Sequence, residues 1–167
     1  MKNFVIGEFR CKCCGDLPEN ARANEVALVD NLLDPVRDIF GSAIKVNSGH
    51  RCLKHNARVG GVKNSQHLSG EAADICAETQ GYRNITDWKM ANQDIVRAIL
   101  KVGRFDQCIL ENVGEHDLLP TWVHVSYSRK SNRGQVLKKV VGKRGYSNLS
   151  TEEICKLLGA GFITKRP

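Results

Sequence analysis

Between residues 19 and 40, apolar side chains recur every three or four positions, which is the period of a helix that buries one face. Gly41 follows at the position where a glycine ends many helices. Pro35 lacks a backbone donor, so either the helix kinks at this point or two helices meet at Asp34 and Pro35. We expect this segment to cover one face of a sheet.

Shorter patterns predict the remaining elements. Runs of apolar residues and apolar-polar alternation indicate strands over residues 43–47, 71–76, 106–111, 122–127 and 135–141. Helices are expected over residues 52–59, 86–102 and 151–158. The basic turn RKSNRG separates the last two strands and predicts that they pair as a hairpin.

The length of 167 residues allows one core of ordinary size and is short for two large domains. Hydrophobic residues make up 41% and charged residues 26%, which is typical of a soluble globular protein. No apolar run approaches the length that crosses a bilayer. The first residues, MKNFVIGEFRCKCCG, lack the unbroken apolar stretch of a secretory signal. We therefore expect synthesis in the cytoplasm without a signal peptide, and another route of release if the protein acts on the cell wall.

Twenty-five Lys and Arg residues against eighteen Asp and Glu residues give a net charge of +7, which favours anionic partners. Nucleic acid, a membrane surface and an acidic bacterial wall are all anionic partners of this kind. Alternatively, the basic residues form a solvated face that only aids solubility. Much of the excess lies after residue 128 and includes Lys165 and Arg166. No helix-turn-helix pattern and no interleaved aromatic residues accompany it, so specific nucleic-acid binding is not expected.

Seven cysteines are present, and their odd number and the missing export signal favour reduced thiols. Cys76 and Cys108 lie in apolar strand-like runs and are expected to be small buried side chains. The sequence CKCC brings Cys11, Cys13 and Cys14 close together. With Cys52 or His55 as a fourth ligand they would form a structural zinc site, although CxCC lacks the paired spacing of common zinc ribbons. The sequence leaves the role of these thiols open.

Two histidines and one aspartate are predicted to converge on a metal. His67 lies in the loop GGVKNSQHLSG, Asp74 on the strand that follows, and His124 on a later strand. Two imidazoles and one carboxylate leave a tetrahedral zinc ion one open position, as catalytic zinc sites require, and zinc there activates water. Taken singly, each residue has another interpretation, as a packed histidine or a structural buried acid. His50 and His55 would compete for the metal.

Amide hydrolysis needs a base and a donor for the developing oxyanion beside the metal ligands. Arg51 lies in the loop that leads to the predicted metal ligands. Its guanidinium can hold a carbonyl or a terminal carboxylate of a substrate. The alternative role is a salt bridge inside the loop. Glu111 ends the strand before the His124 strand and is our candidate for the base, with a solvated strand-end carboxylate as the alternative. The adjacent loop supplies three rivals for this role, Glu115, His116 and Asp117.

Two motifs resemble a known family. SQHLSGEAADI resembles the SxHxxGxAxD signature of the zinc D-alanyl-D-alanine carboxypeptidase family, which also includes wall endopeptidases and phage endolysins. WVHVSY resembles the second histidine motif of that family, and the likeness extends from the cysteine-bearing N-terminal segment to about Tyr127. The resemblance implies Zn²⁺ as the cofactor, substrate or oxyanion contacts from Ser65 and Arg51, and the zinc ligands His67, Asp74 and His124.

The resemblance also implies the α+β fold shared with Hedgehog-like zinc domains, as a single domain with a mainly antiparallel sheet covered by helices. We expect one domain over residues 1–167, with a core of about residues 19–141, a basic C-terminal extension over residues 142–167, and a monomer. The implied substrate is a peptidoglycan stem peptide, cut in the manner of a D-Ala-D-Ala carboxypeptidase or of an endopeptidase.

The chain departs from the family at one place. Better-known relatives carry a catalytic His two residues, or a Glu three residues, before the last ligand, and this chain has Trp122 and Thr121 there. Neither side chain can act as a base, so the role falls to another residue such as Glu111. The alternative function is a catalytically silent zinc module that recognises wall peptides.

Overall fold

The computed structural model describes residues 1–159, so residues 160–167 of the expected basic extension, with Lys165 and Arg166, lie outside the described part. The helical elements are η1 (Ile6–Phe9), α1 (Glu19–Leu28), η2 (Val29–Leu33), α2 (Asp34–Phe40), α3 (Leu53–Arg58), α4 (Ile85–Val102) and α5 (Thr151–Gly159). The strands are β1 (Ile44–Ser48), β2 (Ala72–Ala77), β3 (Gln107–Val113), β4 (Trp122–Ser126), β5 (Gln135–Val140) and β6 (Ser147–Asn148).

The first predicted helix is a run of three helical segments. α1, the π-helical turn η2 and α2 follow one another without a gap. Pro35 lies in the first turn of α2, where its missing N–H costs little, and Gly41 ends α2 in the left-handed conformation at φ 74°. Of the two alternatives at Pro35, a kink or the meeting of two helices, the structure shows the second, because η2 ends at Leu33 and α2 begins at Asp34.

The strands form one six-stranded sheet in the order β1-β2-β4-β3-β5-β6. Its pairs are antiparallel except for β3 and β5, which run parallel, so the α+β class and the mainly antiparallel sheet are confirmed. The predicted hairpin between β4 and β5 is wrong, because β4 already has β2 on one side and β3 on the other.

The chain after β4 crosses the start of β3 and joins the sheet on the far side of that strand. The carboxylate of Asp106 accepts hydrogen bonds from the backbone N–H of Arg133 at 3.0 Å and from its Nε at 2.9 Å. Gly134 and Gln135 continue this crossing with backbone bonds to the carbonyls of Phe105 and Asp106, each at 3.0 Å. These contacts place β5 beside β3 and bring the loop after β5 to the open face of the sheet.

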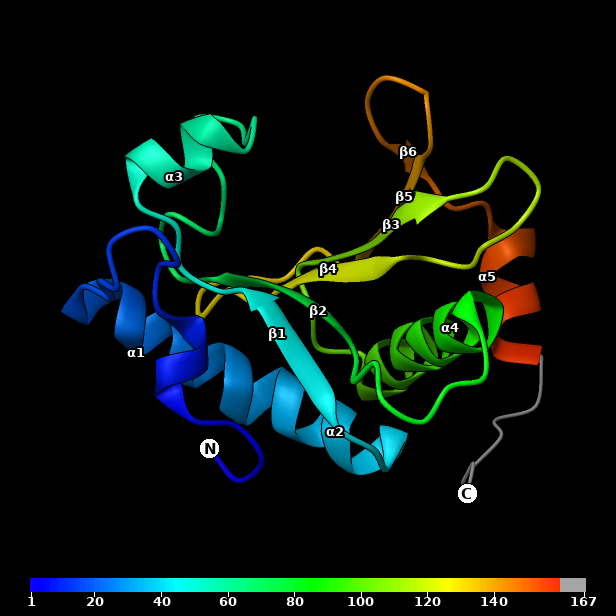
Figure 1. Cartoon of the computed structure of the whole chain (residues 1–167), viewed down its shortest axis with the longest axis horizontal. Coiled ribbons are helices and arrows are strands. Elements are labelled where there is room, and N and C mark those ends of the chain that lie inside the picture. The colour runs from blue at the N-terminus through cyan, green and yellow to red at the C-terminus, as the bar shows by residue number, and fades with distance from the viewer. Residues whose placement is uncertain (160–167) are drawn as a thin grey trace.

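One face of the sheet packs on α1, α2 and α4, while α3 and the loop between β5 and β6 project from the other side (Figure 1). Alternate strand residues form the core with these helices: Ala73, Ile75, Cys108, Leu110, Val123 and Val125. Each large apolar side chain buried there contributes about 1.5–3 kcal/mol. Cys76 and Cys108 are buried as predicted. Within residues 1–159, no helix combines the length and the apolar character that a membrane span requires.

The N-terminal segment packs against the loop that follows β1. Phe4 and Phe9 are buried, and the N–H of His50 donates to the carbonyl of Phe9 at 2.8 Å. A Cβ added at Gly49 would lie 2.6 Å from the Cα of Phe9, so the close approach of the two segments requires glycine. The loop that carries Arg51 is therefore supported from behind by residues near the N-terminus.

Candidate metal centre

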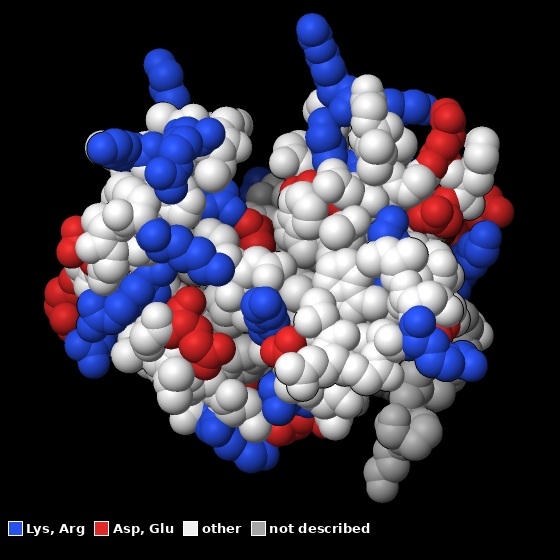
Figure 2. Space-filling model, in the orientation of Figure 1, with Lys and Arg blue, Asp and Glu red and all other residues white. Residues whose placement is uncertain are grey.

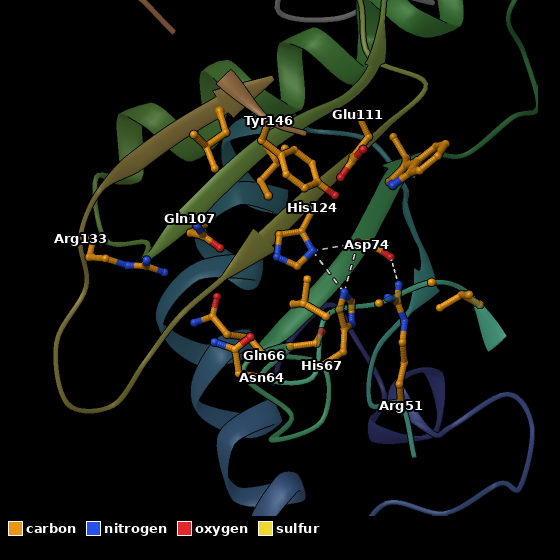
Figure 3. A pocket seen from close by; sticks show the side chains of 18 residues that line it. Arg51, Asn64, Gln66, His67, Asp74, Gln107, Glu111, His124, Arg133 and Tyr146 are labelled. Carbon is orange, nitrogen blue, oxygen red and sulfur yellow. Dashed lines mark hydrogen bonds and ion pairs between the residues drawn. The ribbon is translucent and has the colours of Figure 1, made fainter. Parts of the chain in front are cut away.

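The three predicted ligands converge on the open face of the sheet, where Figure 3 shows them pointing toward one another. Asp74 of β2 and His124 of β4 are direct cross-strand neighbours, and His67 comes from the loop before β2. His67 Nε2 lies 3.1 Å from His124 Nδ1 and 3.3 Å from Asp74 Oδ1, and His124 Nδ1 lies 3.0 Å from Asp74 Oδ1. Ligands about 2.0–2.1 Å from a tetrahedral zinc ion stand about 3.3–3.4 Å apart. The three atoms therefore fit one face of a zinc coordination sphere.

The protonation of His67 suits a metal ligand. Its Nδ1–H donates to the carbonyl of Gly49 at 2.8 Å, which leaves the lone pair of Nε2 facing the other two ligands. Burial lowers the pKa of His67, although Asp74 opposes this effect, so the imidazole is neutral at pH 7. A neutral imidazole is the form that binds a metal ion.

Arg51 holds the second oxygen of Asp74. Its Nη2 forms an ion pair with Asp74 Oδ2, and its Nε donates to the hydroxyl of Ser48 at 2.9 Å. Burial alone would raise the pKa of Asp74, but its interactions with the imidazoles of His124 and His67 outweigh burial and hold the pKa well below its usual range. Asp74 is thus a carboxylate with one oxygen fixed by Arg51 and the other directed at the two imidazoles.

The ligands lie in the wall of a cavity of about 690 Å³. The sheet and the loop before β2 supply most of the other lining residues, among them Asn64, Ser65, Gln66, Gln107, Ile109, Glu111, Trp122 and Leu137. Figure 2 shows the molecule hollowed between two projections, one over α3 and one over the loop between β5 and β6, and both carry Lys and Arg side chains. The volume falls within the roughly 300–1,000 Å³ typical of sites for small ligands.

Glu111 lies on the same wall of the cavity. It is the direct neighbour of Trp122 in the pairing of β3 with β4, and it is 8% exposed. Burial raises its pKa above the ordinary value for a glutamate. Tyr146, from the loop between β5 and β6, directs its hydroxyl toward the Glu111 carboxylate (Figure 3).

Sequence reasoning missed Tyr146 as a lining residue. Tyr146 follows Gly145 in a stretch without periodicity, and only the crossing of the chain over β3 brings it to the cavity. A lone aromatic residue in a basic turn is the one signal that the sequence offered.

The remaining residues that the sequence suggested for the site either line the cavity or lie elsewhere. Ser65 lines the cavity, as Arg51 does. His50 and His55 are directed elsewhere, since a ring nitrogen of His50 lies 3.2 Å from the carbonyl oxygen of His67 and a ring nitrogen of His55 lies 3.5 Å from the sulfur of Cys11. Three rivals for the base are absent from the described lining of the cavity, namely Glu115, His116 and Asp117.

Comparison with known proteins adds two findings. The family model described as peptidase M15 matches residues 2–109, a range that includes Arg51, His67 and Asp74 but ends before β4. The zinc D-Ala-D-Ala carboxypeptidase of Streptomyces albus G is 39% identical to this chain over 62 residues. That alignment covers 37% of this chain and 24% of the relative, so the chain spans about a quarter of the length of the protein that it matches. His124 lies outside the family match, and its place beside the other two ligands comes from the β2–β4 pairing.

Proposed function

This chain belongs to the peptidase M15 family, and we propose that it is a zinc metallopeptidase that hydrolyses peptide bonds in peptidoglycan stem peptides. The observation that carries the proposal is the triangle of His67 Nε2, His124 Nδ1 and Asp74 Oδ1, with sides of 3.0 to 3.3 Å, in a cavity wall. Zn²⁺ is the metal that this donor set and the zinc-named relative both indicate. The D-Ala-D-Ala carboxypeptidase activity in the name of that relative supports the substrate class.

His67, Asp74 and His124 would hold the zinc, which when bound supplies Lewis-acid activation of water and of the scissile carbonyl. Arg51 orients Asp74 through the ion pair with its second oxygen. Partners of this kind are worth about 10–100-fold in metal affinity or activity. Arg51 also lines the cavity, so a donor not used by Ser48 or Asp74 is available to a substrate carbonyl or carboxylate.

Glu111 is the proposed general base, which takes a proton from the attacking water and delivers it to the leaving amine. The family resemblance implies a base two or three residues before the last ligand, where this chain has Trp122 and Thr121. Directly opposed residues of neighbouring antiparallel strands have Cβ atoms about 4.5–5.5 Å apart. Because Glu111 is the cross-strand partner of Trp122, its carboxylate reaches the same part of the cavity from β3. The raised pKa of Glu111 supports this role, because it makes the carboxylate a better proton acceptor.

The cavity also carries groups suited to a peptide that ends in a carboxylate. Arg51 and Arg133 lie in its wall, and Ser65, Asn64 and Gln66 add polar side chains. The basic projections on either side of the hollow (Figure 2) favour approach to an anionic wall polymer. These charges support a wall substrate over an uncharged one.

The direct test is digestion of a synthetic stem pentapeptide and of purified wall by the zinc-loaded chain, with products identified by mass spectrometry. We expect release of a terminal D-Ala or of a stem-peptide fragment, loss of activity with a chelator, and recovery with added zinc. Intact substrate after confirmed zinc loading would contradict the proposal.

A second function rests on the side chains at the family's base positions. Trp122 and Thr121 cannot transfer protons, which favours a zinc module that binds wall peptides without cleaving them. Glu111→Gln separates the two functions: a peptidase loses turnover while it keeps its zinc, whereas a binding module never turns over and keeps its affinity for the peptide. Turnover by the unchanged chain would exclude the binding module.

A further inference from the structure

A second group of potential metal ligands lies between the N-terminal loop and the start of α3. The sulfur atoms of Cys11, Cys13, Cys14 and Cys52 all lie within 4.8 Å of one another, and those of Cys13 and Cys52 are 3.3 Å apart. Four thiolates about 2.3 Å from a tetrahedral zinc ion stand about 3.8 Å apart. The four sulfurs therefore lie close enough together to share one zinc ion.

The backbone of residues 11–16 accounts for the unusual CxCC spacing. The N–H of Cys11 donates to the carbonyl of Asp16 at 3.0 Å, and the N–H of Gly15 donates to the carbonyl of Cys11 at 2.7 Å. Gly15 has a φ of 74°, a conformation that glycine adopts without strain. The closed turn brings three thiols from four consecutive residues together, so a second cysteine pair is not needed.

Backbone donors already serve two of the sulfurs. The N–H of Cys52 points at the sulfur of Cys11, and the N–H of His55 points at the sulfur of Cys52, each at 3.4 Å. Donors of this kind fix the orientation of metal ligands and stabilise them as thiolates. The ring of His55 lies 3.5 Å from the Cys11 sulfur, which makes it a hydrogen-bonding partner of a ligand, while Cys52 supplies the fourth sulfur.

We propose that Cys11, Cys13, Cys14 and Cys52 bind a structural zinc ion. Each thiol releases its proton to solvent on binding, and neither the sulfur nor the metal changes oxidation state. Four sulfur ligands leave no open position, so this ion takes no part in hydrolysis. Soft thiolates select zinc over the harder magnesium and calcium ions.

The position of the cysteine cluster indicates a structural role for the ion. Cys52 follows Arg51 directly in the chain, and Arg51 holds the second oxygen of Asp74. A smaller cavity lined by Lys12, Ser48, Arg51, His55 and Asp74 lies between the two clusters. The ion would therefore tie the N-terminal loop to the residue next to Arg51, and so fix the side chain that orients Asp74.

The test is the zinc content of the purified full chain by elemental analysis, which does not depend on any hydrolytic activity. We expect two zinc ions per chain in the unchanged protein, one in the double variant Cys13→Ser/Cys14→Ser, and one in His67→Ala. The double variant changes only exposed cysteines, whereas Cys11 is buried and its replacement would disturb folding. Cys155→Ser, which removes an exposed cysteine of α5, is the matched control and should keep two ions.

Cobalt replacement gives a second measurement that identifies the ligands. Cobalt bound by thiolates absorbs strongly through charge transfer from sulfur, and this band should persist in His67→Ala but disappear in Cys13→Ser/Cys14→Ser. The double variant should also melt roughly 5 °C or more below the control. Equal zinc content in the double variant and the unchanged chain would overturn the proposal, as would a Cys13–Cys52 disulfide in protein isolated from a reducing cytoplasm.

Discussion

The two clusters of potential metal ligands are built from different parts of the molecule. His124 and Asp74 lie on adjacent strands in the middle of the sheet, and His67 is buried against them in the wall of a large cavity. The four cysteines come from a turn and from the residue before a short helix, and two of them are exposed. The first cluster is a mixed nitrogen and oxygen set open to the cavity, and the second is a set of four sulfurs.

The difference indicates that the first cluster suits a catalytic metal ion and the second a structural one. Three ligands, of which Asp74 and His124 lie on strands and His67 lies on the loop before β2, would leave one side of a tetrahedral ion accessible to water and substrate, whereas four sulfurs would complete the sphere. Strand pairing positions Asp74 and His124, and the bond to the Gly49 carbonyl positions His67, so this set does not require the metal to fold. The second set lies on loops, where a metal ion would replace the regular hydrogen bonding that the segment lacks. Arg51 and Cys52 join the two regions as consecutive residues.

The largest effect is expected from His67→Ala, which breaks the open cluster alone. Loss of a ligand removes the Lewis acid, so kcat/KM for stem-peptide cleavage should fall by about 10³-fold or more. His116→Ala is the matched control, because this exposed histidine lies outside the described lining of the cavity. Activity that survives His67→Ala would place the metal elsewhere.

Glu111→Gln should lower kcat by about 10²–10⁴-fold, because it removes the base and keeps the shape of the side chain. Zinc content should stay at the level of the unchanged protein, since Glu111 is not among the three clustered ligands. Glu115→Gln changes an exposed glutamate of the following loop and should have no effect. Burial raises the pKa of Glu111, so activity should begin to fall at a higher pH than an exposed glutamate would give as the solution is acidified.

Arg51→Lys probes the link between the two clusters. Lysine keeps the positive charge but cannot bond Asp74 and Ser48 together through a planar fork, so zinc affinity and activity should fall about 10–100-fold. Arg58→Lys, at an exposed position of α3, is the control. Unchanged zinc affinity, measured by competition with a chelator, would mean that Asp74 needs no support from Arg51.

The smallest expected effect concerns Glu25, a buried acid without the ion pair and the neighbouring imidazoles that Asp74 has. Neither of its oxygens has a hydrogen-bond partner among the described residues, and burial raises its pKa to about 9. The unfolded chain releases this proton at lower pH than the folded one does. Stability should therefore fall as the pH rises from the unfolded pKa toward about 9, by at most about 1.4 kcal/mol per pH unit.

Glu25→Gln removes the titrating group, so urea unfolding should lose this slope between about pH 5 and pH 8. Glu19→Gln, at an exposed position of the same helix, should keep it. The same slope in both variants would show that other groups cause the pH dependence.

Local patterns predicted much of the fold. Alternation along β2 and β4 placed Asp74 and His124 opposite the core residues, and the resulting register sets the two side by side. The prediction of a hairpin between β4 and β5 was wrong, because strand order depends on which strand edges are already paired. The sequence between the two strands does not encode this. The same error hid Tyr146, which reaches the cavity only because β5 runs beside β3.

The candidate sites likewise contain features that the sequence predicted and features that it did not. The motif around His67 and the strand of Glu111 were visible in the sequence, since each depends on residue type and local spacing. The sequence did not decide between Cys52 and His55 as the partner of the three clustered cysteines, because that choice depends on the direction of two side chains one turn apart at the start of α3.

The most direct test of the central claim is anomalous X-ray diffraction at the zinc edge from crystals of the zinc-loaded chain. We predict a metal peak about 2.0–2.2 Å from His67 Nε2, His124 Nδ1 and a carboxylate oxygen of Asp74, with its open side toward the cavity. A zinc-loaded crystal in which these three side chains carry no metal would contradict the account.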